Sequence, residues 1–349
     1  MTEPATTEPV TAEPVTEDRE SPDPTEISES EAMPVTLAVV GPTAAGKSGL
    51  GLELARRLDG EIVNGDALQA YRLLSIGTDK PTPEMLAEIP HHLVDILDPD
   101  EVFSAGEFAR RARRAIKEIH AAGRVAIVVG GSGLYQRALF EGLSPLPKSD
   151  PEIREELAQR TEKEGLASLY AELREVDPET WARLNPTDPQ RILRALEIYR
   201  TSGVTMTEWL RKKPLEKPLP VFRIGLTVPR GILYDRIGDR VEQMVERGWV
   251  SEVVNLLDRG IEPAAPAFQA IGYRQMVQHV RGDCTLEEAV RDTVQSTRRY
   301  AKRQMTWFRK ESGVRWVPGL ELDTAFFPLL HEIQCMKLRL EERSLNEQA

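Results

Sequence analysis

The chain has 349 residues, two cysteines and a net charge of −11, and ten Asp or Glu against one Arg lie in residues 1–34 alone. The remainder is nearly neutral, so any basic binding surface has to be local. Two cysteines exclude a disulfide framework, and no Cys or His cluster has zinc spacing. We expect neither a membrane span nor a signal peptide, because no apolar run is long enough for the first and the acidic N-terminus lacks the apolar segment of the second. We therefore expect a cytoplasmic protein with two domains.

Residues 1–34 repeat the pattern Glu-Pro-x-Thr-x from Glu3, Glu8 and Glu13 and contain no aromatic residue. Such a segment buries too little apolar surface to offset its ordering entropy. We expect a disordered acidic tail, and a solubilising role is favoured over a docking role.

An apolar run at residues 35–40 leads into a glycine-rich loop, and leucines spaced by four then indicate a helix up to Leu58. This strand, loop and helix match the P-loop pattern, in which backbone N–H groups cradle phosphates and the lysine reaches the outer ones. The Ser48 hydroxyl is the predicted Mg²⁺ ligand. The residues predicted to bind a diphosphate or nucleotide are Gly41, Pro42, Thr43, Ala44, Ala45, Gly46, Lys47 and Ser48.

A second strand is predicted at residues 61–64, and Asp66 follows it directly. Ligands of open α/β sheets lie at the carboxyl ends of the strands, so Asp66 is expected on the rim beside the P-loop. On position alone, a carboxylate that caps a helix or loop is equally consistent with this residue.

A third strand, at residues 124–129, ends at Gly130 and Gly131, where P-loop NTPases usually have an acidic residue that helps hold Mg²⁺. The missing acid argues against a hydrolytic motor or switch. The turn continues to Ser132, and it suits either close approach of a ligand or simply a tight strand-to-helix connection.

Two proline-rich stretches, at residues 144–151 and 213–220, bracket a block with helix signals and no strand signals. We predict an all-helical insertion in a P-loop NTPase-like α/β core with a parallel sheet. Within it, Arg191 and Arg194 lie one turn apart, a spacing that usually marks a solvated or ion-paired face. The predicted units are the tail 1–34, core 35–147, insertion 148–220, core 221–320 and a C-terminal helix 321–349.

The α/β pattern resumes with a strand at residues 222–228 and a helix that carries Arg236 and Arg240 at i, i+4. A long helix then ends in residues 298–310, where six basic residues alternate with Tyr300, Trp307 and Phe308. Basic groups can contact phosphates and aromatics can stack on bases, although the same aromatic spacing suits a core-facing stripe. We favour nucleic-acid contact by the basic residues, with some aromatics buried.

Two functional classes fit these residues, and a third fits less well. One is a small-molecule or nucleotide kinase whose insertion closes as a lid. Another is a transferase that holds a diphosphate leaving group while a nucleic acid is modified, and the basic helix favours it. A nucleotide-gated RNA-binding protein without enzymatic activity is weaker, because Asp66 is expected where chemistry would occur.

The chain resembles the bacterial tRNA dimethylallyltransferases in an ordered series of motifs. The motifs are GPTAAGKS at 41–48, GDALQAY at 65–71, IGTDKP at 76–81, PHHLVDILDP at 90–99, VVGGSGLY at 128–135, GLSPLP at 142–147, DPQRILRALE at 188–197, AIGYRQ at 270–275 and KRQMTWFR at 302–309.

This resemblance implies transfer of a dimethylallyl group from dimethylallyl diphosphate to the exocyclic amine of an adenosine 3′ of the anticodon, with Mg²⁺ as cofactor. Asp66 matches the family's proton-accepting carboxylate, and Thr43 and Arg240 match catalytic positions beside the diphosphate. The adenosine would be flipped into the site. The family usually has serine after this carboxylate, whereas this chain has Ala67.

The resemblance also implies contacts with the tRNA anticodon stem-loop, and we expect a monomer because the RNA would cover much of the surface. The positions that match tRNA-contacting segments are Asp66, Ala67, Leu68, Gln69, Ser132, Arg154, Gln190, Arg191, Ile192, Leu193, Arg194, Gln269, Ala270, Ile271, Gly272, Tyr273, Arg274, Lys302 and Arg303.

Overall fold

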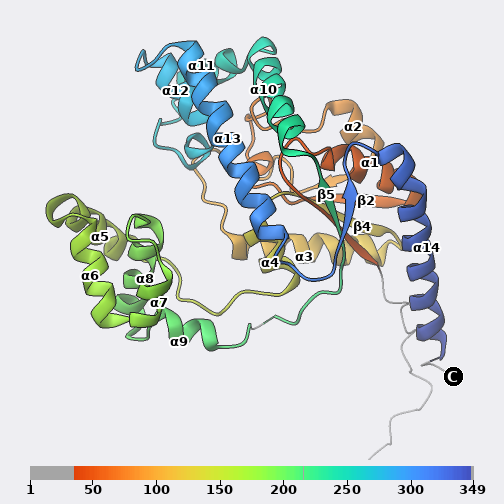
Figure 1. Cartoon of the computed structure of the whole chain (residues 1–349), viewed down its shortest axis with the longest axis horizontal. Coiled ribbons are helices and arrows are strands. Elements are labelled where there is room, and N and C mark those ends of the chain that lie inside the picture. Colours follow the sequence, from red (N-terminus) through yellow and green to blue (C-terminus); the bar gives the residue numbers. More distant parts are fainter. Residues whose placement is uncertain (1–34, 215, 347–349) are drawn as a thin grey trace, which may run out of the picture.

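A computed structural model describes residues 35–214 and 216–346, so the predicted disordered tail lies outside the described residues. Six strands form one parallel sheet in the order β3-β2-β4-β1-β5-β6 (Figure 1). The strands are β1 Thr36–Val40, β2 Gly60–Asn64, β3 His91–His92, β4 Val125–Val129, β5 Phe222–Thr227 and β6 Val314–Pro318. The predicted α/β class with a parallel sheet is confirmed.

The central strands are buried on both faces, which is why they read as continuous apolar runs. Their register places three strand ends at one edge of the sheet. Val39 of β1 and Asn64 of β2 both pair with Val129 of β4, and the Gly65 N–H donates to the Val129 carbonyl. The loops after β1, β2 and β4 therefore meet at this carboxyl edge.

Helices cover both faces of the sheet (Figure 1). On one face, helix α1 (Lys47–Leu58) shares a buried cluster with α14 (Leu322–Asn346). On the other face lie α3 (Ala105–Ala121) and α4 (Gly133–Phe140). The short helices α2 (Pro83–Glu88), η1 (Leu68–Ala70) and η2 (Pro266–Gln269) complete this part.

A group of five helices stands beside the sheet and has a hydrophobic core of its own, including Leu157, Leu169, Leu173 and Leu196 (Figure 1). Three of its helices begin with an Asp cap followed by Pro at the first helical position, which satisfies free N–H groups and fixes the backbone. The helices are α5 Pro151–Glu164, α6 Leu166–Val176, α7 Pro178–Arg183, α8 Pro189–Ser202 and α9 Met206–Arg211.

The polypeptide enters and leaves this helical group along two segments that lie together. An ideal Cβ on Gly142 would lie 2.9 Å from the Pro214 Cβ, and the Leu219 N–H donates to the Phe140 carbonyl at 2.8 Å. The Arg113 side chain of α3 also donates to the Lys217 carbonyl at 2.9 Å. The five-helix group is therefore inserted into the α/β domain through two neighbouring segments.

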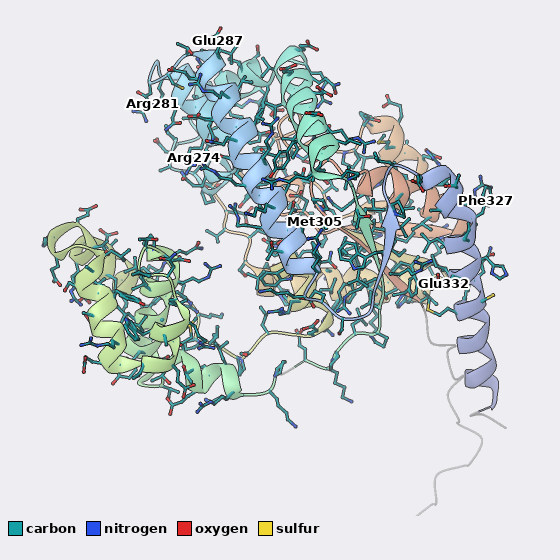
Figure 2. All side chains as sticks on the ribbon, in the orientation of Figure 1. Arg274, Arg281, Glu287, Met305, Phe327 and Glu332 are labelled. Atoms are coloured by element: carbon teal, nitrogen blue, oxygen red, sulfur yellow. The ribbon has the colours of Figure 1, made fainter. Side chains whose placement is uncertain are left out.

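A second helical group lies over the carboxyl edge of the sheet. Its helices are α10 Arg230–Glu246, α11 Trp249–Asp258, α12 Tyr273–Val280 and α13 Leu286–Phe308. Figure 2 shows Arg281 and Glu287 at the outer end of this group and Met305 near the sheet end of α13. In the described part of the chain, no helix is both long and apolar enough to cross a bilayer.

Candidate active site

A cavity of about 500 Å³ lies at the carboxyl edge of the sheet. Its walls come from the P-loop, from the segment after β2, from the glycine turn after β4 and from α10 and α13. It contains Lys47, Asp66 and Arg240 together, although they are far apart in the sequence. The structure therefore brings the main predicted site residues to one place.

The P-loop backbone turns through three residues in left-handed or extended positive-φ conformations. The φ angles are 140° at Gly41, 63° at Ala44 and 93° at Gly46. A Cβ on Gly41 would also lie 3.0 Å from the Leu226 carbonyl oxygen of β5. Glycine at position 41 thus fits both the conformation and the close approach of β5.

Lys47 lies half-buried at the start of α1, where its Nζ donates to the Pro42 carbonyl at 2.8 Å. Burial lowers the pKa of the Lys47 ammonium to about 8, against an opposing effect of Asp66 and with a smaller lowering by Arg240. The site therefore holds a cation that lacks sufficient counter-charge. A bound anion would supply it.

Asp66 is held in place by Asn64, the last residue of β2. The Asp66 N–H donates to the Asn64 Oδ1 at 2.9 Å, and the Asn64 Nδ2 donates to the Asp66 and Leu93 carbonyls. The Asp66 Oδ1 accepts from the Leu68 N–H at 3.0 Å, and no hydrogen bond within the described chain reaches Oδ2. Asp66 thus both stabilises the turn and lines the cavity, so the two sequence-based interpretations are compatible.

Arg240 joins α10 to the P-loop. Its Nη1 donates to the Thr43 Oγ1 at 2.8 Å, and its Nη2 lies 3.3 Å from the Asp79 Oδ2. Asp79 also pairs with Arg247 at 3.1 Å. Arg236 lines the same cavity, as its spacing from Arg240 predicted.

Two cavity residues on α13 were not predicted as site residues. The Gln304 Oε1 accepts from the Thr43 N–H at 2.9 Å, and its Nε2 donates to the Gly131 carbonyl at 2.9 Å. Tyr300 lines the cavity one turn earlier, and burial together with the charge of Asp66 raises the pKa of its hydroxyl. Their spacing of four is the signal that both share one helix face.

The glycine turn after β4 is explained by close packing. A Cβ on Gly130 would lie 2.3 Å from the Gly65 carbonyl oxygen, and a Cβ on Gly131 would lie 2.1 Å from the Gln304 Nε2. Both glycines also line the cavity. Ser132 is the N-cap residue of α4, and its side chain makes no capping hydrogen bond.

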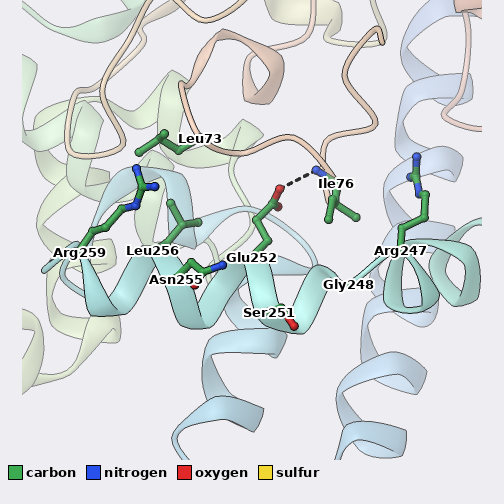
Figure 3. A pocket seen from close by; sticks show the side chains of 9 residues that line it. All are labelled: Leu73, Ile76, Arg247, Gly248, Ser251, Glu252, Asn255, Leu256 and Arg259. Atoms are coloured by element: carbon green, nitrogen blue, oxygen red, sulfur yellow. Dashed lines mark hydrogen bonds between the residues drawn. The ribbon is translucent and has the colours of Figure 1, made fainter. Parts of the chain in front are cut away.

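The loop that carries Asp79 is held from outside by Glu252 of α11 (Figure 3). Its carboxylate accepts from the N–H groups of Ser75 and Ile76 at 2.9 and 2.8 Å, and from the Tyr273 hydroxyl at 2.6 Å. An outer hollow of about 520 Å³, drawn in Figure 3, lies beside this loop and shares Arg247 with the main cavity.

The residues predicted to contact tRNA are distributed over three parts of the surface. Leu193, Ala270, Ile271 and the residues Ala67, Leu68 and Gln69 are half-buried, the last three beside the cavity. The exposed members are Arg154, Gln190, Arg191, Gln269, Arg274, Lys302 and Arg303. The tRNA assignment stays a prediction carried by this exposed set.

Some of the predicted contact residues face the interior instead. Ile192 belongs to the core of the five-helix group and Tyr273 packs against Trp249, and both are fully buried. These two side chains are therefore not exposed in the structure, and the assignment of their positions to tRNA contact stays a prediction. Arg194 pairs with Glu197 at 3.0 Å, as expected for an ion-paired face, and donates to the Pro147 carbonyl.

The Ser48 hydroxyl lines the cavity at the first turn of α1 and is exposed. Within the described ranges, no group of three or more His, Cys, Asp or Glu side chains could hold a metal ion. The cavity lining does include the Ser48 hydroxyl and the Asp66 carboxylate, which are oxygen donors of the kind that Mg²⁺ prefers.

The IPP transferase family model matches residues 69–311. The tRNA dimethylallyltransferase of Syntrophobacter fumaroxidans is 48% identical over 285 residues, covering 81% of this chain and 83% of the relative, and that of Geobacter sulfurreducens is 45% identical, covering 80% and 91%. The crystal structure of the Bacillus halodurans tRNA isopentenylpyrophosphate transferase has a TM-score of 0.66 at 40% identity, covering 90% of this chain and 99% of that one. A eukaryotic dimethylallyltransferase acting on tRNA has a TM-score of 0.70 at 27% identity, covering 83% and 75%. The chain belongs to the IPP transferase family.

Proposed function

We propose that this chain transfers a dimethylallyl group from dimethylallyl diphosphate to the exocyclic amine of the adenosine 3′ of the anticodon, in tRNAs that read codons beginning with U. Diphosphate is released. The names of the relatives support tRNA as the substrate. The observation that carries the proposal is the meeting of an anion cradle, Lys47, Arg240 and the carboxylate of Asp66 in one cavity.

The P-loop holds the diphosphate of the prenyl donor. Negative charge grows on this leaving group as the allylic carbon–oxygen bond breaks, so fixed positive groups stabilise the transition state. Lys47 and Arg240 supply these charges. Arg240 is already oriented by the Thr43 hydroxyl at 2.8 Å and therefore needs little reorganisation.

Mg²⁺ fits this site, with the Ser48 hydroxyl and the diphosphate oxygens as ligands. When bound, it would neutralise part of the charge on the leaving diphosphate. The remaining tasks belong to the side chains: Asn64 orients Asp66, and Thr43 orients Arg240.

Asp66 accepts the proton of the attacking amine. The bond between the first prenyl carbon and the diphosphate oxygen breaks, a bond from that carbon to the adenine nitrogen forms, and one proton of the nitrogen moves to Asp66. The Oδ1 is already engaged by the Leu68 N–H, so Oδ2 is the accepting atom. The adenine is flipped out of the RNA to reach the cavity, whose volume suits a base and a small prenyl group.

The glycine turn disfavours the kinase alternative. A P-loop phosphotransferase usually has an acidic residue at the end of a central strand, to hold the metal ion. Any side chain at position 130 would collide with the Gly65 backbone, where a Cβ has only 2.3 Å to the nearest atom. A carboxylate at that place has no room in this fold.

Exposed basic side chains on α13 and in the five-helix group form the proposed surface for the anticodon stem-loop. Lys302 and Arg303 lie near the cavity end of α13, and Arg154 and Arg191 project from the five-helix group. RNA recognition depends on shape and phosphate contacts, which suits scattered cations. The proposal includes a monomeric enzyme that works in the cytoplasm.

A transfer assay tests the proposal. Purified protein and Mg²⁺ are incubated with radiolabelled dimethylallyl diphosphate and an unmodified tRNA with consecutive adenosines 3′ of its anticodon, and a parallel reaction contains labelled ATP. Prenyl label in the RNA, without phosphorylation of any component, is the expected result. Phosphate transfer from ATP with no prenyl label would return the chain to the kinase class.

A further inference from the structure

Gln304 is a buried polar side chain on the helix that carries the exposed basic residues. It is 5% exposed, whereas Lys302 and Arg303 on the preceding positions point to solvent. Its amide bridges two loops of the active site, because it accepts from the Thr43 N–H and donates to the Gly131 carbonyl, both at 2.9 Å. One side chain thus connects α13 to the P-loop and to the glycine turn.

The glycine turn is shaped to receive α13. A Cβ on Gly131 would lie 2.1 Å from the Gln304 Nε2, and a Cβ on Gly133 would lie 2.3 Å from the Trp307 ring. Arg137 of α4 covers Trp307 with its guanidinium carbon 4.6 Å from the ring centre. Gln304 and Trp307 of α13 can therefore pack here only because Gly131 and Gly133 have no side chains. A shift of α13 would change these contacts with the turn.

The Gln304 contact continues through Thr43 to the cations of the site. Gln304 holds the Thr43 backbone, and the Thr43 hydroxyl accepts from Arg240, which in turn pairs with Asp79. The position of α13 therefore influences the orientation of Arg240. No other side chain in the described structure hydrogen-bonds to both the P-loop and the glycine turn.

We propose that Gln304 is a positioning residue that couples RNA binding on α13 to diphosphate binding in the P-loop. This inference rests on the proposed function. RNA phosphates that bind Lys302 and Arg303 restrain α13, and the Gln304 amide then fixes Thr43 and Arg240 in the arrangement that holds the diphosphate. Linkage requires the reverse as well, so bound diphosphate strengthens RNA binding.

The coupling is measured by binding, without turnover. The dissociation constant of a fluorescent anticodon stem-loop is determined with and without saturating inorganic diphosphate and Mg²⁺. We expect diphosphate to tighten RNA binding of the unaltered protein by about fivefold or more, the lower range of measured couplings. In Gln304→Met, which keeps the volume but removes both hydrogen bonds, this ratio falls to near one.

Two further variants separate the role from general damage. In Gly131→Ala, the added methyl group displaces the Gln304 amide from the glycine turn. This variant is expected to lower the ratio of the RNA dissociation constants without and with diphosphate. Gln295→Met alters an exposed glutamine on the same helix and keeps the coupling of the unaltered protein. In steady-state transfer, Gln304→Met raises KM for the prenyl donor by about tenfold and changes kcat less, as expected when binding of the diphosphate is weakened.

The outcomes distinguish this inference from the proposed function. Full coupling in both Gln304→Met and Gly131→Ala, or no coupling in the unaltered protein, would overturn the role of Gln304. Absence of prenyl transfer by the unaltered protein would instead count against the proposed function. Thermal unfolding midpoints of the three variants serve as the control for folding.

Discussion

The Arg240 guanidinium donates a 2.8 Å hydrogen bond to the Thr43 hydroxyl, and this contact joins α10 to the P-loop across 197 residues of sequence. It places a cation beside the P-loop. The Asp79 carboxylate lies 3.3 Å from the second terminal nitrogen of Arg240, so the guanidinium contacts both side chains.

Arg240→Lys is expected to lower kcat/KM for prenyl transfer by roughly 10²–10³-fold, the range found when one preorganised donor to a developing negative charge is removed. A lysine keeps the charge but cannot contact Thr43 and Asp79 at the same time. Arg259→Lys, which lines only the outer hollow, is the matched control. Steady-state kinetics that show equal losses in both variants would contradict the assignment.

Asp66→Asn is expected to reduce transfer by about 10²–10⁴-fold, the usual contribution of a general base. The amide oxygen can still accept from the Leu68 N–H, so the turn is retained. Binding of inorganic diphosphate, followed by calorimetry, remains near that of the unaltered protein. A variant that turned over at the unaltered rate would exclude Asp66 as the proton acceptor.

Affinity for inorganic diphosphate is expected to fall as the pH rises through about 8, because burial lowers the pKa of Lys47 to about 8 and the anion prefers the charged form. Stability of the free protein changes in the opposite direction. Between about pH 8 and the ordinary lysine pKa of 10.5, the unfolded state binds more protons at this site than the folded state. Its contribution therefore makes the free energy of unfolding rise with pH there.

Calorimetric titration at several pH values checks the affinity, and Lys47→Met should remove this pH dependence. Binding at pH 8 should also take up protons, which buffers of different ionisation enthalpy reveal. Equal affinities at pH 7 and pH 9.5 in the unaltered protein would contradict a lowered pKa of the Lys47 ammonium.

Gly130→Ala is expected to lower the free energy of unfolding by at least about 1–3 kcal/mol, because the added methyl group overlaps the Gly65 backbone at 2.3 Å. Gly238→Ala is the same substitution in the interior of α10, where a Cβ meets nothing within 4 Å. It should have the opposite effect and raise the free energy of unfolding by about 0.5–1 kcal/mol. Denaturant unfolding of both variants measures the contrast. Unchanged stability in Gly130→Ala would show that the turn can open.

Glu252→Ala is expected to destabilise the loop that carries Asp79. It leaves the buried Tyr273 hydroxyl and two backbone N–H groups without their acceptor, at a cost of about 1–3 kcal/mol for an unsatisfied buried group. Hydrogen exchange at Ser75 and Ile76 should accelerate, while Ser251→Ala, an exposed change on the same helix, should leave it unaltered. Equal protection in both variants would argue against this anchor.

Much of the fold and the family can be predicted from local sequence patterns and the order of the motifs. The strand, P-loop and helix around Lys47 follow from an apolar run, loop glycines and leucine spacing, and prolines mark both ends of the five-helix group. The ordered series of motifs is by itself enough to indicate the family. Asp66 was correctly placed beside the P-loop because parallel strands end at the same edge.

Side-chain direction was less predictable, because it depends on contacts distant in sequence. Ile192 and Tyr273 lie within motifs associated with RNA contact, yet tertiary packing buries both. Gln304 lies among basic residues that suggest a solvated face, and only the nearby Gly131 makes room for it. The two-residue strand β3 has no local signal at all, since its pairing with β2 alone defines it.

The near-coincident entry and exit of the five-helix group has a consequence for synthesis on the ribosome. Strand β1 occupies the sheet centre, yet its partner β5 starts only at Phe222, after the whole group has been translated. Until then one edge of β1 is open and vulnerable to mispairing. The five-helix group depends on short-range contacts and has its own core, so it can fold during this interval. Once β5 is released it pairs with this edge of β1, and β6 then joins the sheet beside β5.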